Sequence, residues 1–498
     1  MYNSINPMLL IDGYKADHRR QYPVGTEYVY SNFTPRQSRI ESVNKVVFFG
    51  LQYFILEYLL KRWNIDFFDR KKDDIIKEYK RRMDNYLGSD AISCEHIEAL
   101  HNNSFLPIRI KALPEGTLTP IGIPVLTIVN TKPEFFWLTN YLETLLSNIL
   151  WKPITSATTA FQYRKKFEEY ALKTGYDRDF IKWQGHDFSF RGMGGNEDAL
   201  LSGAAHLLSF TGTDTIPAID FLEKYYYANS DRELVGGSVP ATEHSVMSMG
   251  DKENEIDTFR RLILKTYPKG IVSIVSDTWD FWKVLTDYMP KLKKDILSRE
   301  GRLVIRPDSG DPVKIICGDN ESSDSLITPE QKKGAYELLW DVFGGTINDK
   351  GYKVLNPKVG LIYGDSITLN RQNEILSLLE KKGFSASNLV LGIGSYTYVY
   401  TTRDIYGFAM KATWGKVNGV AKDIYKNPKT DSGFKKSAKG LLMVTRDVNG
   451  LKLKDQCTEE EERSGELKIV YEDGFIIRKT SLSDIRDLIN KQLNFHTL

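Results

Sequence analysis

The sequence predicts an α/β protein in which an irregular β/α barrel is inserted into a discontinuous, largely antiparallel α+β domain. In the middle of the chain, short apolar runs end abruptly in polar or glycine-rich residues and are followed by helix-like stretches. Nearer both ends, strand-like runs alternate with turn signals. A chain of 498 residues, of which 41% are hydrophobic, is too long for one ordinary core, so we expect at least two domains.

The antiparallel part is predicted from both ends of the chain. Between residues 107 and 130, strand-like runs flank the turn signal Pro114-Glu115-Gly116. Near the C-terminus, hairpins are predicted at Asn449-Gly450 and at Asp473-Gly474, because these pairs readily take the positive φ angles of tight turns. A closing helix should begin near Ser481 to Ser483.

Seven apolar runs in the middle are predicted to supply the strands of the barrel, which we place in residues 181–399. All strands of a parallel β/α barrel end on one face, so side chains distant in sequence should converge in one pocket there. The flanks, 1–180 and 400–498, would form the discontinuous domain. The runs and their polar endings are His186–Gly192, Phe210–Asp214, Ser238–His244, Val272–Asp277, Val304–Gly310, Leu361–Asp365 and Leu389–Gly394.

The charge balance and the cysteine content argue against several classes of protein. Lys plus Arg (67) nearly cancels Asp plus Glu (65), so no global basic field gathers nucleic acid or anionic lipid. Cys94, Cys317 and Cys457 have neither zinc spacing nor the even count of a disulfide framework, which favours a reducing compartment. No targeting signal is visible, and no apolar run reaches the ~20 residues of a membrane helix. We therefore expect a cytoplasmic protein with neither a nucleic-acid nor a membrane partner.

Three predicted strands end in an aspartate: Asp277, Asp308 and Asp365. One such residue is usually a helix N-cap, which would explain it without any catalysis. Three on one face, together with the cations and histidine of the neighbouring endings, favour a functional site instead. Carboxylates can hold ribose hydroxyls or bind Mg²⁺, while a guanidinium suits phosphate oxygens. The accompanying residues are Arg191, Arg306 and His244.

The residues at two further strand ends can be interpreted either as structural or as functional. Gly392-Ile393-Gly394-Ser395 is either a plain strand-to-helix turn or a place where backbone N–H groups approach a phosphate. His244 is either an ordinary packed residue or a nucleophile towards a phosphoryl donor, with a carboxylate such as the neighbouring Glu243 setting its tautomer. His186 and His206 are interpreted as structural, and the segment from Asp12 to Lys15 as an ordinary amphipathic opening.

In chain order, these endings resemble the nicotinamide phosphoribosyltransferase family. The resemblance extends from residue 9 to the C-terminal hairpins, and an ordered series is far more specific than any one of its members. The motifs that carry it are Asp12-x-Tyr14-Lys15, His186-Asp187-Phe188-x-x-Arg191-Gly192, Gly212-Thr213-Asp214-Thr215, Ser238-Val239-Pro240-Ala241-x-Glu243-His244-Ser245, Val275-Ser276-Asp277, Ile305-Arg306-Pro307-Asp308-Ser309-Gly310, Gly364-Asp365 and Thr402-Arg403-Asp404.

The resemblance implies a homodimer whose two active sites each use residues of both chains. It places the pyridine ring between Phe188 and the partner's Tyr14, with Arg191 on the carboxamide oxygen and Asp214 accepting from its NH₂. An ionised carboxylate at position 214 would repel nicotinate. The remaining substrate-binding residues that the resemblance implies are Asp12, Arg306, Gly364 and Asp365, together with the phosphate-binding Gly394, Ser395, Arg36, Arg403 and Lys411.

The resemblance also implies the reaction. Phosphoribosyl pyrophosphate would be the donor, with Mg²⁺ on the departing pyrophosphate and attack by the pyridine nitrogen at the anomeric carbon. ATP would phosphorylate His244 and so couple hydrolysis to product formation. The catalytic residues would be His244, Glu243, Asp277 and Asp308. Gly394-Ser395-Tyr396 and Ala409 depart from the glycine run and the serine of relatives, so phosphate affinity or ATP coupling could differ.

Two alternatives remain open at this point. A nicotinate phosphoribosyltransferase would share the architecture, although Asp214 argues against it. A non-catalytic binding or signalling protein of the same fold is the other, and the retained acidic, basic and aromatic residues argue against that.

Overall fold

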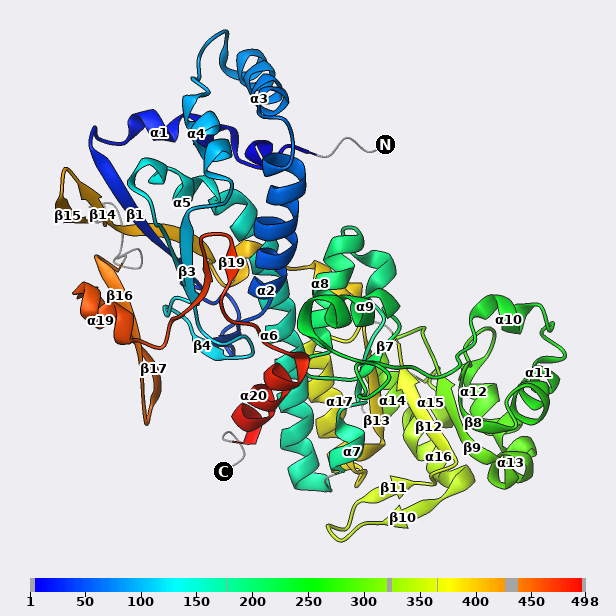
Figure 1. Ribbon diagram of the computed structural model, residues 1–498. Helices are drawn as coiled ribbons and strands as arrows, with labels where there is room; N and C mark the ends of the chain where they lie inside the picture. The colour runs from blue at the N-terminus through cyan, green and yellow to red at the C-terminus, as the bar shows by residue number, and fades with distance from the viewer. Residues whose placement is uncertain (1–4, 176, 320–324, 365, 426–437, 495–498) are drawn as a thin grey trace. The chain divides into compact units, whose positions relative to one another are not determined.

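The computed structural model describes residues 5–175, 177–319, 325–364, 366–425 and 438–494 (Figure 1). The chain forms two compact units, and both are discontinuous in sequence. The first unit comprises Met1–Thr158, Lys224–Ala228 and Thr402–Gln492. The second comprises Thr159–Glu223, Asn229–Thr401 and Leu493–Leu498.

The first unit is built on a seven-stranded sheet with the order β15-β14-β1-β5-β3-β18-β19, in which each pair of neighbours is antiparallel. Strands from the two ends of the chain therefore lie side by side, as blue β1 and orange β14 do in Figure 1. The strands of this unit are β1 (Thr26–Thr34), β2 (Lys45–Val47), β3 (Ile108–Ala112), β4 (Leu118–Pro120), β5 (Leu126–Asn130), β14 (Ala409–Val417), β15 (Val420–Asp423), β16 (Leu441–Asp447), β17 (Gly450–Cys457), β18 (Lys468–Glu472) and β19 (Phe475–Ile476).

Both predicted C-terminal hairpins are present. Strands β16 and β17 pair up to Asp447 and Gly450, and β18 pairs with β19 across a turn in which Asp473 and Gly474 have φ angles of 47° and 87°. The final helix begins at Leu482, where the Oγ of Ser481 accepts from the N–H of Asp484 at 3.1 Å. The helices of this part of the chain are α1 (His18–Gln21), α2 (Leu51–Tyr53), α3 (Lys72–Leu87), α4 (Glu95–Asn103), α5 (Leu138–Tyr141), α6 (Glu143–Thr174), α19 (Glu459–Ser464) and α20 (Leu482–Asn494).

The second unit is built on a six-stranded parallel sheet with the order β7-β6-β13-β12-β9-β8. Six of the seven apolar runs thus form strands. The seventh, Ser238–His244, forms no named strand, but Ala241 makes a single parallel bridge to Ser273, and Gly237 just before the run makes one to Gly212. The strands are β6 (Gly185–Asp187), β7 (Gly212–Thr213), β8 (Lys269–Val275), β9 (Glu300–Arg306), β12 (Val359–Tyr363) and β13 (Leu389–Ile393), with a separate hairpin of β10 (Gly345–Ile347) and β11 (Lys353–Leu355).

Alternation along the parallel strands separates a core from a cavity. Leu303, Ile305, Leu361 and Leu391 are at most 1% exposed and pack with apolar residues of the surrounding helices. Their neighbours along the strands point to the opposite face, because successive side chains alternate. The helices are α7 (Arg178–Ile181), α8 (Asn196–His206), α9 (Ile216–Tyr226), α10 (His244–Ser248), α11 (Glu255–Arg261), α12 (Phe281–Lys283), α13 (Met289–Ser298), α14 (Pro312–Cys317), α15 (Pro329–Lys333), α16 (Ala335–Phe343), α17 (Leu369–Lys381) and α18 (Ser395–Val399).

The predicted mixture of a parallel sheet with antiparallel sheets is confirmed, while the insertion of a complete barrel into a flanking domain stays a prediction. Within the described residues, no helix is long and apolar enough to cross a membrane. All three cysteines are free thiols.

A buried carboxylate fixes the start of the helical segment that begins with α2. Glu115 accepts from the backbone N–H groups of Gly50 and Gln52, both at 2.6 Å, and from the hydroxyl of Tyr226 at 2.9 Å. Gly50 has a φ of 106°, which favours glycine there. Burial raises the pKa of Glu115 to about 7, although these three hydrogen bonds oppose the rise.

We expect Glu115 to make stability depend on pH. Its ordinary pKa is 4.5, so the folded protein binds the proton at a higher pH than the unfolded chain does. The stabilisation is therefore complete below pH 4.5 and is lost as the pH rises through 7. At ~1.4 kcal/mol per pKa unit, the loss is about 3 kcal/mol.

In urea unfolding at several pH values, the stability of the wild type relative to Glu115→Gln should fall by this amount across that range. The exposed Glu98 supplies the control variant Glu98→Gln, which removes a surface carboxylate instead of a buried one. A pH-independent difference between wild type and Glu115→Gln would contradict the assignment.

Candidate active site

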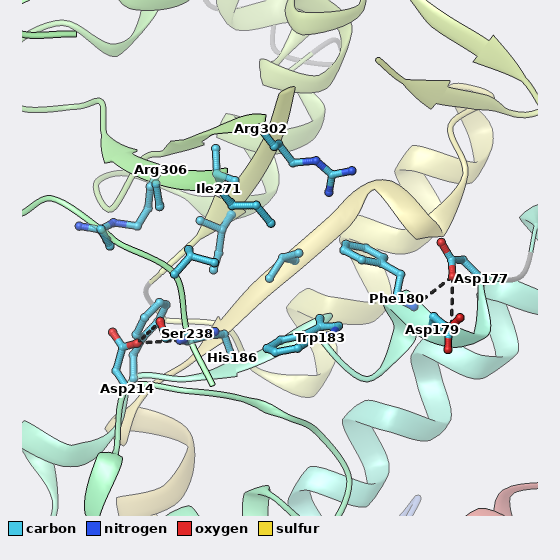
Figure 2. A pocket seen from close by; sticks show the side chains of 17 residues that line it. Asp177, Asp179, Phe180, Trp183, His186, Asp214, Ser238, Ile271, Arg302 and Arg306 are labelled. Carbon is cyan, nitrogen blue, oxygen red and sulfur yellow. Dashed lines mark hydrogen bonds and ion pairs between the residues drawn. The ribbon is translucent and has the colours of Figure 1, made fainter. Parts of the chain in front are cut away.

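The inner face of the parallel sheet encloses a cavity of about 410 Å³ (Figure 2). Its walls are apolar in the middle, where Val304, Ile362 and Val390 come from three neighbouring strands. Polar residues lie at both ends. Asp214, Ser238 and Arg306 lie where strands or strand-like segments end, and Arg302 shares the opposite end with Asp177 and Asp179.

The Asp214 carboxylate is anchored at the cavity rim by two side chains. His186 Nε2 lies 2.9 Å from Asp214 Oδ1, and the hydroxyl of Ser238 donates to the same oxygen at 2.7 Å. The backbone N–H of Asp214 donates to the carbonyl of Asp187 at 2.9 Å, which ties the end of β7 to β6. Burial raises the pKa of Asp214, but the hydrogen bond and charge of His186, the hydrogen bond from Ser238 and the charge of Arg306 outweigh it, so the pKa is lowered overall. The side chain is therefore an anion at neutral pH.

Phe188 lies beside this pair, directly after β6. Its N–H donates to the carbonyl of Ile393 at 3.0 Å, and its ring centroid lies 4.5 Å from that of His186. Glycines leave the space that the ring and its neighbours need. A Cβ at Gly392 would lie 2.6 Å from Phe188 Cδ2, and a Cβ at Gly364 would lie 2.5 Å from Asp308 Oδ1. The flat aromatic face and the anchored carboxylate together suit a planar ligand with an N–H donor.

The ends of β8 and β9 bring together a second group of predicted residues. The N–H of Asp308 donates to Asp277 Oδ2 at 2.9 Å, and Arg306 Nε lies 3.6 Å from Asp308 Oδ2. Asp277 Oδ1 and Arg306 Nε are buried, and neither has a hydrogen-bond partner among the described residues. Buried polar atoms are nearly always hydrogen-bonded in native proteins, so these two are available to a polar ligand.

These two aspartates are not the caps of the helices that follow them. Asp280 accepts from the N–H of Lys283 at the start of α12, and Asp311 accepts from the N–H groups of Val313 and Lys314 at the start of α14. The N-cap reading therefore fails for Asp277 and Asp308. Asp365, the third predicted aspartate, lies outside the described residues.

His244, the first residue of α10, faces the same group. Its Nδ1 lies 3.1 Å from the Thr278 hydroxyl, and its Nε2 lies 3.8 Å from Asp277 Oδ1. Its side chain is 50% exposed. The Glu243 carboxylate accepts from the Ser245 hydroxyl instead, so the carboxylate neighbour of the imidazole is Asp277. This ring can reach a solvent-borne reactant.

Arg191, Gly394 and Ser395 also lie on the edge where the strands end. Arg191 is exposed in the 3₁₀ helix Phe190–Gly192 that follows β6. Ser395 opens α18, and a Cβ at Gly192 would lie 2.1 Å from its Oγ, so the segments after β6 and β13 touch. Among the described residues, no group of three or more His, Cys, Asp or Glu side chains could by itself hold a metal ion.

The remaining predicted residues belong to the first unit. Asp12 accepts from the hydroxyl of Thr144 at 2.8 Å, and Tyr14 is 61% exposed. Arg36 donates from Nε to the carbonyl of Gly407 at 3.2 Å, which sets it beside the segment that carries Arg403. Lys411 is exposed on β14.

Sequence reasoning missed His186, which was interpreted as structural. Its side chain points to the same face as that of Phe188, two residues later, and the period of two along a strand could have shown this. The same period links Arg302, Val304 and Arg306 along β9. Ser238 gave no signal by itself, because serine is common in loops.

Comparison with family models gives two matches. Residues 183–474 match the nicotinate phosphoribosyltransferase (NAPRTase) family, and residues 6–100 match the N-terminal domain of nicotinamide phosphoribosyltransferase. Among curated proteins, the chain is 57% identical to the nicotinamide phosphoribosyltransferase of Acinetobacter baylyi, with 98% of each chain covered. It is 32% identical to that of Xanthomonas campestris pv. campestris, with 97% of each covered.

Solved structures show a similar fold at low sequence identity. The nicotinate-nucleotide pyrophosphorylase of Pyrococcus furiosus aligns with a TM-score of 0.58 and 14% identity, covering 100% of this chain and 98% of that one.

We expect the close approach at Gly392 to make it intolerant of a side chain. Gly392→Ala would press a methyl group against Phe188 and the backbone of Gly364, and such overpacking costs about 1–3 kcal/mol. Gly394→Ala is the matched control, because nothing lies within 4 Å of its added Cβ and neither glycine has a positive φ. Thermal unfolding should show a lowered midpoint for Gly392→Ala alone. Equal midpoints for the two variants would refute the packing argument.

Proposed function

The chain belongs to the nicotinamide phosphoribosyltransferase family, and from this premise we propose that it forms nicotinamide mononucleotide and pyrophosphate from nicotinamide and phosphoribosyl pyrophosphate, in NAD salvage. The observation that carries the proposal is the anchored, ionised Asp214 beside Phe188 at the rim of the cavity. The pyridine ring would lie against Phe188, and the carboxamide N–H would donate to Asp214. The carboxylate of nicotinate would meet a like charge there.

The reaction needs no general base. The pyridine nitrogen attacks the anomeric carbon of the ribose with its lone pair, and the C–O bond to pyrophosphate breaks with its electrons leaving on the pyrophosphate. A neutral pyridine nitrogen has no proton to lose. Asp277 and Asp308 would hold the ribose hydroxyls and stabilise positive charge on the sugar, while Arg306 would contact departing or bound phosphate oxygens.

Mg²⁺ fits this arrangement as an ion held mainly by the donor. Asp277 Oδ1, which has no hydrogen-bond partner among the described residues, and the partly exposed Asp308 carboxylate could accept hydrogen bonds from its water ligands. Such an ion would offset the charge of the departing pyrophosphate.

We assign ATP coupling to His244. A nitrogen of its exposed imidazole would take the terminal phosphoryl group of ATP, forming an N–P bond as the bond to ADP breaks. Thr278 on Nδ1 and Asp277 near Nε2 support this role, because they orient the ring. Later hydrolysis would couple ATP consumption to product formation.

The proposed enzyme is a homodimer with shared sites. Asp12, Tyr14, Arg36, Arg403 and Lys411 of one protomer would complete the site of its partner. Tyr14 would cover the face of the pyridine ring opposite Phe188, and its 61% exposed side chain is consistent with a role at an interface.

The substrate assignment predicts the behaviour of Asp214→Ser. Removing the charge should lower kcat/KM for nicotinamide by roughly 10- to 100-fold, as expected for loss of a hydrogen bond to a charged group, and weaken the preference over nicotinate. Pyrophosphate release should be measured with each base. The exposed Asp220 supplies the control Asp220→Ser, which should keep the wild-type preference. A wild type that prefers nicotinate would establish the alternative enzyme, and ligand binding without any pyrophosphate release would establish a non-catalytic protein.

The coupling assignment predicts that His244→Ala loses stimulation by ATP. The variant should still form mononucleotide at its rate without ATP, because the imidazole takes no part in the attack on the ribose. Initial rates with and without ATP, together with acid-labile phosphate on the protein, would measure this. Ser248→Ala, in the same helix α10, is the control that should retain stimulation. Undiminished stimulation in His244→Ala would exclude the phosphohistidine.

A further inference from the structure

His186, which contacts Asp214, takes no part in the proposed reaction itself. We infer that His186 is a positioning residue for base specificity, on the premise of the proposed function: it holds the Asp214 carboxylate so that Oδ2 stays available to the substrate carboxamide.

Both anchoring donors act on the same carboxylate oxygen. His186 Nε2, at 2.9 Å, and the Ser238 hydroxyl, at 2.7 Å, both meet Asp214 Oδ1. No other hydrogen bond to this carboxylate is found in the described part of the chain. An ionised carboxylate has about four acceptor positions, so Oδ2 keeps its full capacity. The carboxylate cannot rotate to present Oδ1 instead without breaking both bonds.

The imidazole is itself held in place. His186 is 9% exposed and lies on β6, whose backbone pairs with β13 on one side and with β7 on the other. A Cβ at Gly212 would lie 2.7 Å from His186 Nδ1, so the ring lies against the bare backbone of β7. The Phe188 ring lies 4.5 Å away on another side. The ring therefore has little room to turn, and Nε2 is the nitrogen that faces Asp214.

The hydrogen-bond chemistry fixes the direction of this contact. An ionised carboxylate only accepts, so Nε2 carries the proton and donates it. The proton that Nε2 donates fixes the orientation of the carboxylate, and Oδ2 is left facing the substrate position.

His186→Asn and His186→Gln form a matched pair that tests this role. The amide nitrogen of Gln can reach the position of Nε2, whereas that of Asn corresponds to Nδ1 and falls short of Asp214. In steady-state kinetics, His186→Asn should raise KM for nicotinamide by roughly tenfold and reduce the preference over nicotinate. KM for phosphoribosyl pyrophosphate and kcat should change by less than ~3-fold, a smaller effect than loss of one hydrogen bond. His186→Gln should restore the wild-type KM and preference.

Ser238→Ala provides an independent arm, because Ser238 is exposed and its loss does not threaten the fold. In wild type this change should have a smaller effect than His186→Asn, because Ser238 is exposed and water can replace its hydroxyl as a donor. Combined with His186→Asn, it should raise KM for nicotinamide by more than the product of the single effects, because the last anchor is lost.

Three results would overturn the role of His186. One is equal KM values and base preference for the Asn and Gln variants. Another is a His186→Asn variant in which kcat falls, KM rises for both substrates and the thermal midpoint is lowered, which would indicate a role in packing alone. If His186→Asn does not fold, His186→Gln and Ser238→Ala take its place in the test. The inference is supported if neither single variant changes the base preference and their effects on KM for nicotinamide multiply in the double variant. It is overturned if Ser238→Ala alone abolishes the preference. Failure of the proposed function is distinct, since the wild type itself would then lack nicotinamide-dependent pyrophosphate release.

Discussion

Parallel pairing of the strands in the second unit is the constraint on which the site depends. Because β6, β7, β8, β9, β12 and β13 all run in one direction, their carboxyl ends meet at one edge of the sheet. Residues as distant in sequence as Asp187 and Ile393 are paired neighbours there. The buried face of each strand supplies the core and the other face lines the cavity, so stability and binding use alternate residues of the same segments.

The sequence predicted this edge well because strand endings are local signals. The apolar run before Asp277 or Asp308 is visible in one short window, and six of the seven such runs form strands. What a window cannot show is which polar residue serves which purpose. Asp277 and Asp280 both follow β8 within a few residues, yet the second caps α12 and the first keeps a buried oxygen with no hydrogen-bond partner among the described residues. Only packing across β8 and β9 distinguishes them.

His186 illustrates the other limit of sequence reasoning. Its importance comes from Asp214, Ser238 and Gly212, which lie on two other segments and are brought together by strand pairing and by the bridge at Gly237. A histidine in an apolar run is most often a packed core residue, and no residue near His186 in the sequence indicates that Asp214 is its partner. The first-unit residues present a related case, because Tyr14 and Lys411 carry little local signal and depended on the resemblance to a family.

The way Asp214 is anchored decides how the rim would discriminate between the two bases under the proposed function. In the described residues, the side chains that hydrogen-bond to Asp214 are His186 and Ser238, while Arg306 acts on this carboxylate only through its charge, so no arginine pairs with it there. Two like charges ~4 Å apart at an effective dielectric of ~20 repel by about 4 kcal/mol, and a charge cancelled by a cation would lose most of that effect. The side chain is 47% exposed, so solvent reduces the repulsion further. The repulsion that remains is modest, but an amide and a carboxylate differ so little in size that their difference in shape has an even smaller effect. Under the proposed function, charge and not shape is therefore the property by which this rim would separate the two bases.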